Sequence, residues 1–282
     1  MSIREIDVSA VRDAVAKLCI RANTVVDPAV YEAIRKAQTT EASPVGRNIL
    51  GQLVENADIA RAAGTPICQD TGLAVVFVTI GQEVHFIGGS LEEAIHAGVA
   101  DGYTAGYLRK SVVADPLRRT NTGNNTPAII HYHVVPGDSF EITVAPKGIG
   151  SENMSRLYML KPSQGADGIR EAVLTTVREA GASACPPLVI GVGVGGSFEK
   201  CAELAKEALL RPIGRHSEDP FWADFEKDLL DRVNGLGIGP QGLGGTTTAL
   251  WLAVEPYATH IGGLPVAVCL NCHVARHESA VL

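Results

Sequence analysis

The chain has 282 residues, of which 46% are hydrophobic and 20% are charged, a composition typical of a globular protein with a hydrophobic core. Its 24 lysines and arginines against 31 aspartates and glutamates give a net charge of −7, which argues against a nucleic-acid partner because such proteins normally carry a basic excess. The apolar runs are too short for a membrane span and the N-terminal residues lack the pattern of a signal peptide, so we expect a cytoplasmic protein with no membrane partner.

The first part of the chain predicts helices interrupted by one strand. Apolar residues recur at three- and four-residue steps over residues 8–18, and a second amphipathic stretch covers residues 44–63. A break rich in Gly, Pro and Thr then leads into an apolar strand over residues 73–80. A helix over residues 91–107 follows, with Ser90 placed to cap its N-terminus.

The second part of the chain mixes strands and helices. Strands over residues 128–135 and 139–145 flank Pro136-Gly137-Asp138, which predicts a β-hairpin. The other expected elements are helices over residues 167–181, 197–210 and 220–233, and strands over residues 188–192, 248–254 and 265–270. Because strands and helices do not alternate regularly, the sequence predicts an α+β fold with mixed helices and a largely antiparallel sheet.

Six segments between these elements are too polar and too rich in glycine to be simple turns. They cover residues 69–72, 121–127, 147–155, 191–197, 239–248 and 269–277. Several of them end strands or begin helices, where exposed backbone N–H groups can bind an anion. Together they predict a site for a small acidic ligand.

The segment Gly191–Gly196 fits the pattern G-x-G-x-x-G and lies between an apolar run and an expected helix. A dinucleotide-binding turn also needs a second strand that ends in an acidic residue about 20 positions further on. Here the helix continues into Leu210-Arg-Pro-Ile-Gly-Arg215 instead. We therefore favour tight backbone packing or an anion contact, and nucleotide binding is the alternative.

The chain has six cysteines, and those at positions 19 and 201 lie on expected helices as core residues. Cys269-Leu-Asn-Cys272-His273 matches a haem-attachment pattern, could hold zinc together with His277, or could be a thiol redox pair. No export signal, second cysteine pair or thioredoxin-like context supports these three alternatives.

Three cysteines, Cys68, Cys185 and Cys272, each lie in a loop beside polar residues. One by one, each is interpreted more simply as a buried thiol. Together they could converge on one 4Fe–4S cluster, which three thiolates would leave with one iron free to act as a Lewis acid.

Six motifs closely resemble the iron–sulfur hydro-lyases of the class I fumarase and tartrate dehydratase family. They are Ile67-Cys-Gln-Asp-Thr-Gly72, Lys147-Gly-Ile-Gly-Ser-Glu-Asn153, Ala184-Cys-Pro-Pro187, Arg211-Pro-Ile-Gly214, Gly239-Pro-Gln-Gly-Leu243 and Cys272-His-Val-Ala-Arg276. The resemblance covers nearly the whole chain and matches the separate alpha subunit of the two-subunit forms. It implies that residues 1–282 form a single iron–sulfur hydro-lyase alpha-type, N-terminal catalytic domain.

The resemblance also implies the ligands of the cluster and the residues around it. A 4Fe–4S cluster would be held by Cys68, Cys185 and Cys272, whereas Cys269 has no counterpart among the family's ligands. Gln69 and Asp70 would be catalytic.

By the same resemblance His260 would be a third catalytic residue, and Arg109 would bind the substrate together with the backbone of Gly148 or Gly150. A dicarboxylate needs cationic and N–H donors at both ends, and an arginine offers a planar pair of donors. Arg118 and Arg119 are alternatives for the anion contact.

The implied reaction is the reversible hydration of fumarate to malate, because the Lys147 motif resembles fumarase alpha subunits. An L-tartrate dehydratase or a methylfumarate-type hydratase is the alternative. The family's carbon-acid base has no counterpart in this chain, so we expect a beta subunit as partner, in an α2β2 assembly. A hypothesis of another class is a non-enzymatic iron–sulfur or zinc protein that acts as a sensor or scaffold.

Overall fold

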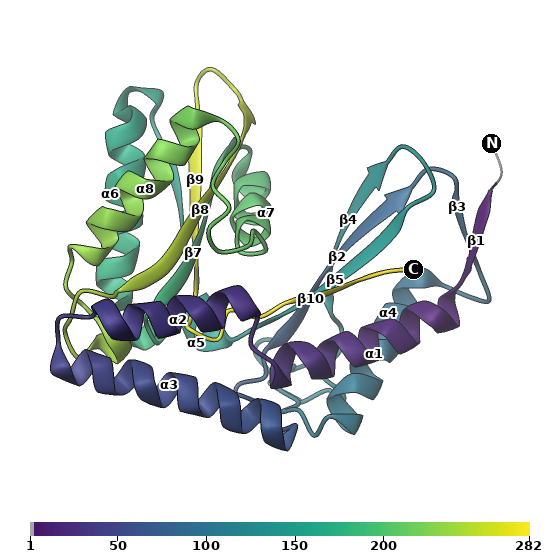
Figure 1. Cartoon of the computed structure of the whole chain (residues 1–282). Coiled ribbons are helices and arrows are strands. Elements are labelled where there is room, and N and C mark those ends of the chain that lie inside the picture. Colours follow the sequence, from purple (N-terminus) through teal and green to yellow (C-terminus); the bar gives the residue numbers. More distant parts are fainter. Residues whose placement is uncertain (1–2) are drawn as a thin grey trace. The chain divides into compact units, whose positions relative to one another are not determined.

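The structure is a computed structural model that describes residues 3–282, folded into two compact units. The first unit contains the described residues up to Asp27, then Asp58–Ile149 and Arg276–Leu282. The second unit contains Pro28–Ala57 and Gly150–Ala275. Each unit has its own four-stranded sheet and its own hydrophobic core (Figure 1). Among the described residues, no helix combines the length and the apolar character needed to cross a bilayer.

The first unit packs two helices against a mixed sheet of strand order β10-β5-β2-β4. Its elements are β1 (Arg4–Asp7), α1 (Val8–Thr24), β2 (Leu73–Gly81), β3 (Val84–Ile87), α4 (Leu91–Ala105), β4 (Ile129–Val135), β5 (Phe140–Lys147) and β10 (Glu278–Val281). Helices α1 and α4 cover one face of the sheet, as Figure 1 shows. Val15 of α1, Ile95 of α4 and Val76 of β2 are fully buried in the core between the helices and the sheet.

The hairpin predicted between residues 128–135 and 139–145 is wrong. Both segments are strands, but β2 lies between them, parallel to β4 and antiparallel to β5, so that Val78 is opposite both Tyr132 and Ile142. Strand β2 is apolar along nearly its whole length and is mostly buried, which favours the central position. In strand β4 apolar and polar residues alternate, and this strand lies at the edge of the sheet.

The second unit places helices on both faces of a sheet of strand order β6-β9-β7-β8. Its elements are α2 (Pro28–Thr40), most of α3 (Pro44–Ala63), most of α5 (Ile149–Glu152), β6 (Arg156–Leu160), α6 (Gly165–Ala180), β7 (Leu188–Gly196), α7 (Phe198–Ala208), α8 (Pro220–Asn234), β8 (Ala249–Thr259) and β9 (Leu264–Asn271). Helices α6 and α8 pack on one face and α7 packs on the other (Figure 1).

The Gly191–Gly196 segment belongs to strand β7, so its placement between elements is wrong, whereas its interpretation as tight packing is confirmed. A Cβ atom on Gly191 would lie 2.0 Å from the carbonyl oxygen of Ala205, and one on Gly193 would lie 2.0 Å from that of Cys201. Only glycine lets the backbone of α7 approach the strand this closely.

The α+β class is confirmed, and each four-stranded sheet contains two antiparallel pairings and one parallel pairing. The predicted helix over residues 44–63 matches α3 to the residue, and the Ser90 hydroxyl caps α4 by accepting from the Glu93 N–H at 3.4 Å. Sequence analysis missed α2, although Val30, Ile34 and Ala37 have helical spacing. It also missed four short strands, β1, β3, β6 and β10. Such strands are hard to predict because their partners are distant in the sequence or because the strands themselves are only weakly apolar.

Candidate functional site

In the first unit, the loop before β2 presents the Cys68 sulfur and the Asp70 carboxylate. The Ile67 N–H donates to the carbonyl of Asn23 at 2.9 Å and anchors the loop to the end of α1. The Asp70 N–H points at the Cys68 Sγ at 3.4 Å, and Gln69 Oε1 lies 3.4 Å from the same sulfur. The Cys68 sulfur therefore accepts a backbone N–H, and sulfur is the atom through which a cysteine binds metals.

The Asp70 carboxylate is held at both oxygens by backbone donors. Oδ1 accepts from the Gly72 N–H at 3.1 Å, and Oδ2 accepts from the Ile149 N–H at 2.8 Å. Gly72 has φ +82° and lies so close to Lys147 that a Cβ atom there would be 2.8 Å from the Lys147 nitrogen. The close approach of these two segments therefore sets the orientation of the carboxylate, with Gly148 directly beside it.

Arg276 holds this loop from the other end of the chain, a role that sequence analysis missed. Its Nη2 donates to the Asp70 carbonyl at 2.5 Å and its Nε donates to the Pro146 carbonyl at 3.2 Å. The residue is only 4% exposed, and its Nη1 is buried with no hydrogen-bond partner among residues 3–282. The motif Cys272-His-Val-Ala-Arg276 contains this arginine, but the sequence shows neither its burial nor the two carbonyls that it contacts.

Arg109 is fixed beside the same loop through its backbone. The Thr71 hydroxyl accepts from the Arg109 N–H at 2.9 Å and lies 3.3 Å from the Arg109 carbonyl. The fully buried Asn125 joins the next residues to the loop, accepting from the Ser111 N–H at 2.7 Å and donating to the Gly72 carbonyl at 3.2 Å. The polar segment over residues 121–127 thus holds the residues that follow Arg109 against the loop.

A cavity of about 420 Å³ opens beside these residues within the first unit. Asp70, Arg109 and Arg119 line it, whereas Arg118 is not among its lining residues. Two guanidinium groups and one carboxylate around a small cavity suit an acidic ligand that also exchanges a proton. Since the chain has a net charge of −7, such local cations are needed to attract a dianion.

In the second unit, the structure brings Cys185 and Cys272 together through His273. The His273 N–H donates to the Cys185 carbonyl at 3.4 Å, and its Nδ1 lies 3.2 Å from the same oxygen. Gln241 donates from its backbone and from Nε2 to the Pro186 carbonyl, both at 2.7 Å, and its Nε2 lies 3.3 Å from the His273 Nδ1. Three of the six motifs therefore meet at one end of the sheet.

Cys185 has a backbone conformation that few non-glycine residues adopt. It follows a short 3₁₀ helix over Gly181–Ala184 with φ +55° and ψ 61°, and its side chain is exposed. Such left-handed residues cost free energy and are concentrated at functional sites, where the surrounding contacts hold them in place. The observation supports a functional rather than a packing role for this thiol.

Glu41 stabilises the glycine-rich loop that contains Gln241, and sequence analysis missed it. The carboxylate is 1% exposed and accepts from the N–H groups of Ser43, Thr246 and Thr247 at 2.8–3.0 Å. Burial opposes its charge, but these donors outweigh burial and lower the pKa of Glu41 to about 2. Thr248 continues the connection, because its hydroxyl accepts from the Gly239 N–H at 3.2 Å.

His260 lies at the opposite end of the same sheet from the two cysteines. Asn271, next to Cys272, pairs with Val189 at the start of β7, whereas Thr259 pairs with Gly196 at its end. Strand β7 has nine residues, which corresponds to roughly 25 Å. The structure therefore does not bring His260 to Cys185 and Cys272 within one chain.

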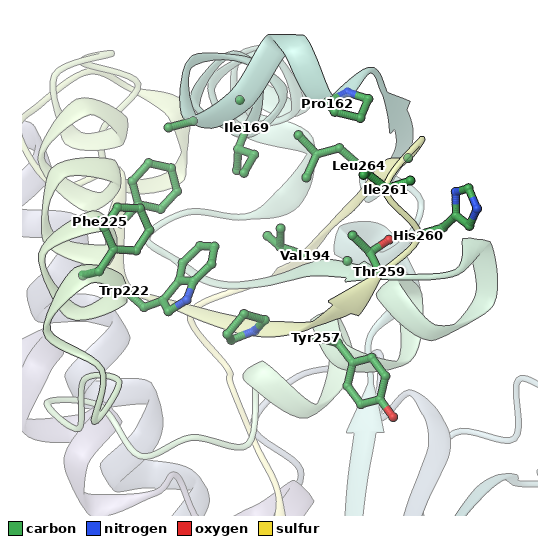
Figure 2. Close-up of a pocket in the computed structure, with 16 residues that line it drawn as sticks. Pro162, Ile169, Val194, Trp222, Phe225, Tyr257, Thr259, His260, Ile261 and Leu264 are labelled. Carbon is green, nitrogen blue, oxygen red and sulfur yellow. The ribbon is translucent and has the colours of Figure 1, made fainter.

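The ring of His260 lies at the edge of an apolar cavity of about 420 Å³ (Figure 2), and its Nδ1 accepts from the Gly262 N–H at 3.0 Å. Aromatic residues of α8, including Trp222 and Phe225, form one wall of this cavity. No lysine or arginine lines the cavity among the residues that the structure describes. It is therefore a poor site for a dicarboxylate, in contrast to the cavity beside Asp70.

The remaining predicted residues are placed as follows. Gly148 follows β5 in the first unit, and Gly150 lies in the short helix α5 in the second. Cys19 and Cys201 are fully buried, which confirms them as core residues, and burial raises the pKa of Cys19 to about 12. Cys269 lies within β9 as predicted.

Comparisons with known proteins agree with the motifs. Residues 12–281 match the family described as fumarate hydratase (fumerase). The chain is 41% identical over 273 residues, covering 94% of this chain and 95% of the relative, to a protein of Methanocaldococcus jannaschii named L(+)-tartrate dehydratase subunit alpha, an assignment that its name marks as provisional. It is 31% identical over 279 residues to the L(+)-tartrate dehydratase subunit alpha of Escherichia coli K12, covering 98% of this chain and 91% of the relative.

Proposed function

Because the chain belongs to the fumarate hydratase family of hydro-lyases, we propose that it is the cluster-bearing alpha subunit of an enzyme that reversibly hydrates fumarate to malate. The observation that supports this most strongly is the arrangement around Asp70. A carboxylate oriented by two backbone donors shares a small cavity with Arg109 and Arg119, and its neighbour Cys68 receives an N–H. This set combines a proton-transfer group, anion-binding groups and a metal-binding thiol.

The proposed cofactor is a 4Fe–4S cluster with Cys68, Cys185 and Cys272 as its ligands. The residues fit such a group. The Cys68 sulfur accepts an N–H, Cys185 is exposed in a left-handed conformation, and the residue after Cys272 bonds to the Cys185 carbonyl. When bound with three protein thiolates, the cluster supplies an iron with an open position that acts as a Lewis acid. The cysteines persist as thiols in a reducing compartment such as the cytoplasm.

In this mechanism Asp70 transfers a proton to or from the hydroxyl oxygen of the substrate. Its two backbone hydrogen bonds keep the carboxylate in one orientation, which general acid–base catalysis requires. Gln69, exposed and adjacent to the Cys68 sulfur, orients the same oxygen. The loop geometry that places both residues depends on Arg276.

Arg109 and backbone N–H groups at Gly148 or Gly150 bind the substrate carboxylates. An arginine can donate two parallel hydrogen bonds to one carboxylate, and this pairing carries much of the recognition of a dianion. Arg119 lines the same cavity and is the second candidate for this contact. Discrimination against a methylated substrate would be modest, because one methyl group changes binding by only about 1–3 kcal/mol.

The proposed enzyme needs a partner. Both relatives compared above are named as alpha subunits, and the family resemblance assigns the carbon-acid base to none of the motifs of this chain. We therefore propose a beta subunit that supplies the base, in an α2β2 assembly. The proposed role of His260 is to hydrogen-bond a substrate carboxylate or to support Asp70, and because His260 is far from Cys185 and Cys272 within one chain, this role requires the second alpha chain of that assembly.

L-tartrate dehydration is the second candidate function, and the names of the relatives favour it. Both reactions move water to or from a small dicarboxylate, so one experiment tests both. The alpha chain is reconstituted anaerobically with iron and sulfide, with and without the beta subunit, and is assayed with fumarate, malate and L-tartrate. A visible charge-transfer band and turnover only with both subunits would support the proposal, and the better substrate would decide between the two reactions.

The absence of a band would contradict the cluster, provided that the thiols of Cys68, Cys185 and Cys272 titrate as reduced. Zinc binding or thiol redox chemistry would then be the interpretation to pursue. A band without turnover on any of the three substrates, even with the beta subunit, would favour the sensor or scaffold hypothesis.

A further inference from the structure

Cys269 lies in a polar cluster that the proposed hydration does not use. It is in strand β9 of the second unit, three residues before Cys272. Its Sγ lies 3.7 Å from the Lys206 Nζ of α7, 3.7 Å from the Glu152 Oε2 and 3.7 Å from the Ser155 hydroxyl. Lys206 and Glu152 form an ion pair at 2.5 Å. The thiol therefore has an ammonium group, a carboxylate and a hydroxyl as neighbours.

The same cluster borders a cavity of about 260 Å³. Cys269, Lys206, Glu152 and Ser155 are among its lining residues, and Arg156 adds a second cation. Cys269 as a whole is only 4% exposed, but its position on the cavity wall lets a molecule of a few atoms approach the sulfur. Larger reagents are excluded by the burial of the strand.

The other buried thiols have different surroundings. Cys19 and Cys201 are fully buried, and burial raises the pKa of both, so neither forms the reactive thiolate. Cys201 donates to the Phe198 carbonyl at 3.3 Å instead of contacting a cation. Lys206 has different surroundings: burial lowers its pKa, but its interactions with Cys269 and Glu152 outweigh burial and raise the pKa.

We propose that Cys269 is a peroxide-sensitive modification site, at which Lys206 stabilises the thiolate and hydrogen peroxide converts it to sulfenic acid. The thiolate sulfur attacks one peroxide oxygen, so that an S–O bond forms and the O–O bond breaks. The sulfur is oxidised by two electrons and the peroxide is reduced by two. The departing hydroxide takes a proton from the Lys206 ammonium and leaves as water.

Two variants change the rate in opposite directions. Lys206→Met removes the cation that stabilises the thiolate, and a change of one pKa unit alters the thiolate population about tenfold, so we expect oxidation to slow about tenfold or more. Glu152→Gln removes the carboxylate that competes for Lys206 and repels the thiolate, so oxidation should become faster. Lys206→Arg retains the positive charge and should keep most of the rate.

The experiment exposes the reconstituted enzyme with its beta subunit to brief pulses of hydrogen peroxide. Each pulse is ended by unfolding the protein in denaturant that contains a diketone probe, so that the probe reaches any sulfenic acid already formed. Peptide mass spectrometry then measures labelling at Cys269 and Cys201 separately. Labelling at Cys269 but not at Cys201, with the predicted order of rates among the variants, supports the proposal. Lys200→Met is the matched control on the same helix, because Lys200 pairs with Glu203 at 3.1 Å, and it should leave the rate unchanged.

Unlabelled Cys269, or equal rates in the parent and Lys206→Met, would overturn the proposal. Labelling of Cys201 in Lys206→Met would show that this variant is misfolded, and the decision would then rest on Glu152→Gln and Lys206→Arg. The readout is a covalent change at one thiol. It therefore stands or fails separately from turnover and from the cluster.

Discussion

Arg276 and Asp70 are 206 positions apart, yet the Arg276 Nη2 donates to the Asp70 carbonyl at 2.5 Å. The last segment of the chain, which also contributes β10 to the edge of the first sheet, thereby holds the loop that contains Cys68 and the proposed acid–base residue. Arg276 is a buried cation with two carbonyl partners, and its Nη1 has no hydrogen-bond partner in the described part of the chain, so it is costly to maintain. In return, the contact of Arg276 with the Asp70 carbonyl holds the Asp70 loop in place.

Replacing Arg276 by lysine should destabilise the protein and weaken activity together. Lysine cannot reach both the Asp70 and Pro146 carbonyls, so one buried acceptor loses its partner. Such a loss lowers the free energy of unfolding by about 1–3 kcal/mol. Urea unfolding and turnover of the assembled enzyme measure the two effects. Arg21→Gln is the control, because Arg21 forms an exposed ion pair with Glu278 that contributes about 1 kcal/mol or less. Equal effects of the two substitutions would argue against the role of Arg276.

Replacing Asp70 by asparagine should abolish most of the turnover while the cluster remains. Asparagine can keep an oxygen for one backbone donor but cannot transfer the proton, and loss of a general acid–base group costs about a hundredfold to ten-thousandfold in rate. Visible absorbance and iron content monitor the cluster, and steady-state assays monitor turnover. Asp138→Asn, in the connection between β4 and β5, is the control. Unchanged turnover in Asp70→Asn would reject the assigned role.

Replacing Cys68, Cys185 or Cys272 by serine should each prevent cluster assembly, because three thiolates are required. Cys269→Ser should retain the cluster, since Cys269 contacts Lys206 and Glu152 instead. Iron and sulfide content after anaerobic reconstitution decides between these outcomes, with circular dichroism to confirm folding. A cluster lost in Cys269→Ser but kept in Cys272→Ser would exchange the assignment of these two residues.

Glu41 should make the stability of the protein depend on acidic pH. The pKa of the Glu41 carboxyl is lowered from the ordinary glutamate value of 4.5, expected in the unfolded chain, to about 2 in the folded protein. A folded-state pKa below the unfolded value stabilises the protein above the unfolded pKa, by roughly 3 kcal/mol here, and this stability is lost as the pH falls from 4.5 to about 2. Urea unfolding between neutral pH and pH 2 should show a smaller decrease in Glu41→Gln than in the parent. Glu32→Gln, an exposed pair of Arg35, should leave the slope unchanged.

Much of the local structure and the family could be predicted from the amino-acid sequence. Helical periodicity located α3 to the residue, and the cysteine-containing motifs, each only a few residues long, identified the hydro-lyase family that the comparisons confirm. Both kinds of information are local, because a helix is defined by neighbours along the chain and a motif by adjacent side chains.

Which distant residues meet could be seen only in the folded chain. In the folded chain β2 lies between β4 and β5. Arg276 contacts Asp70, and Glu41 contacts the loop of Gln241. His260 is separated from Cys185 and Cys272 by the length of a strand. Sheet order and buried ion contacts depend on competition for the interior among segments far apart in the chain. Burial of the most apolar strand and the choice of partners for buried charges are properties of the whole folded unit, so no local pattern contains them.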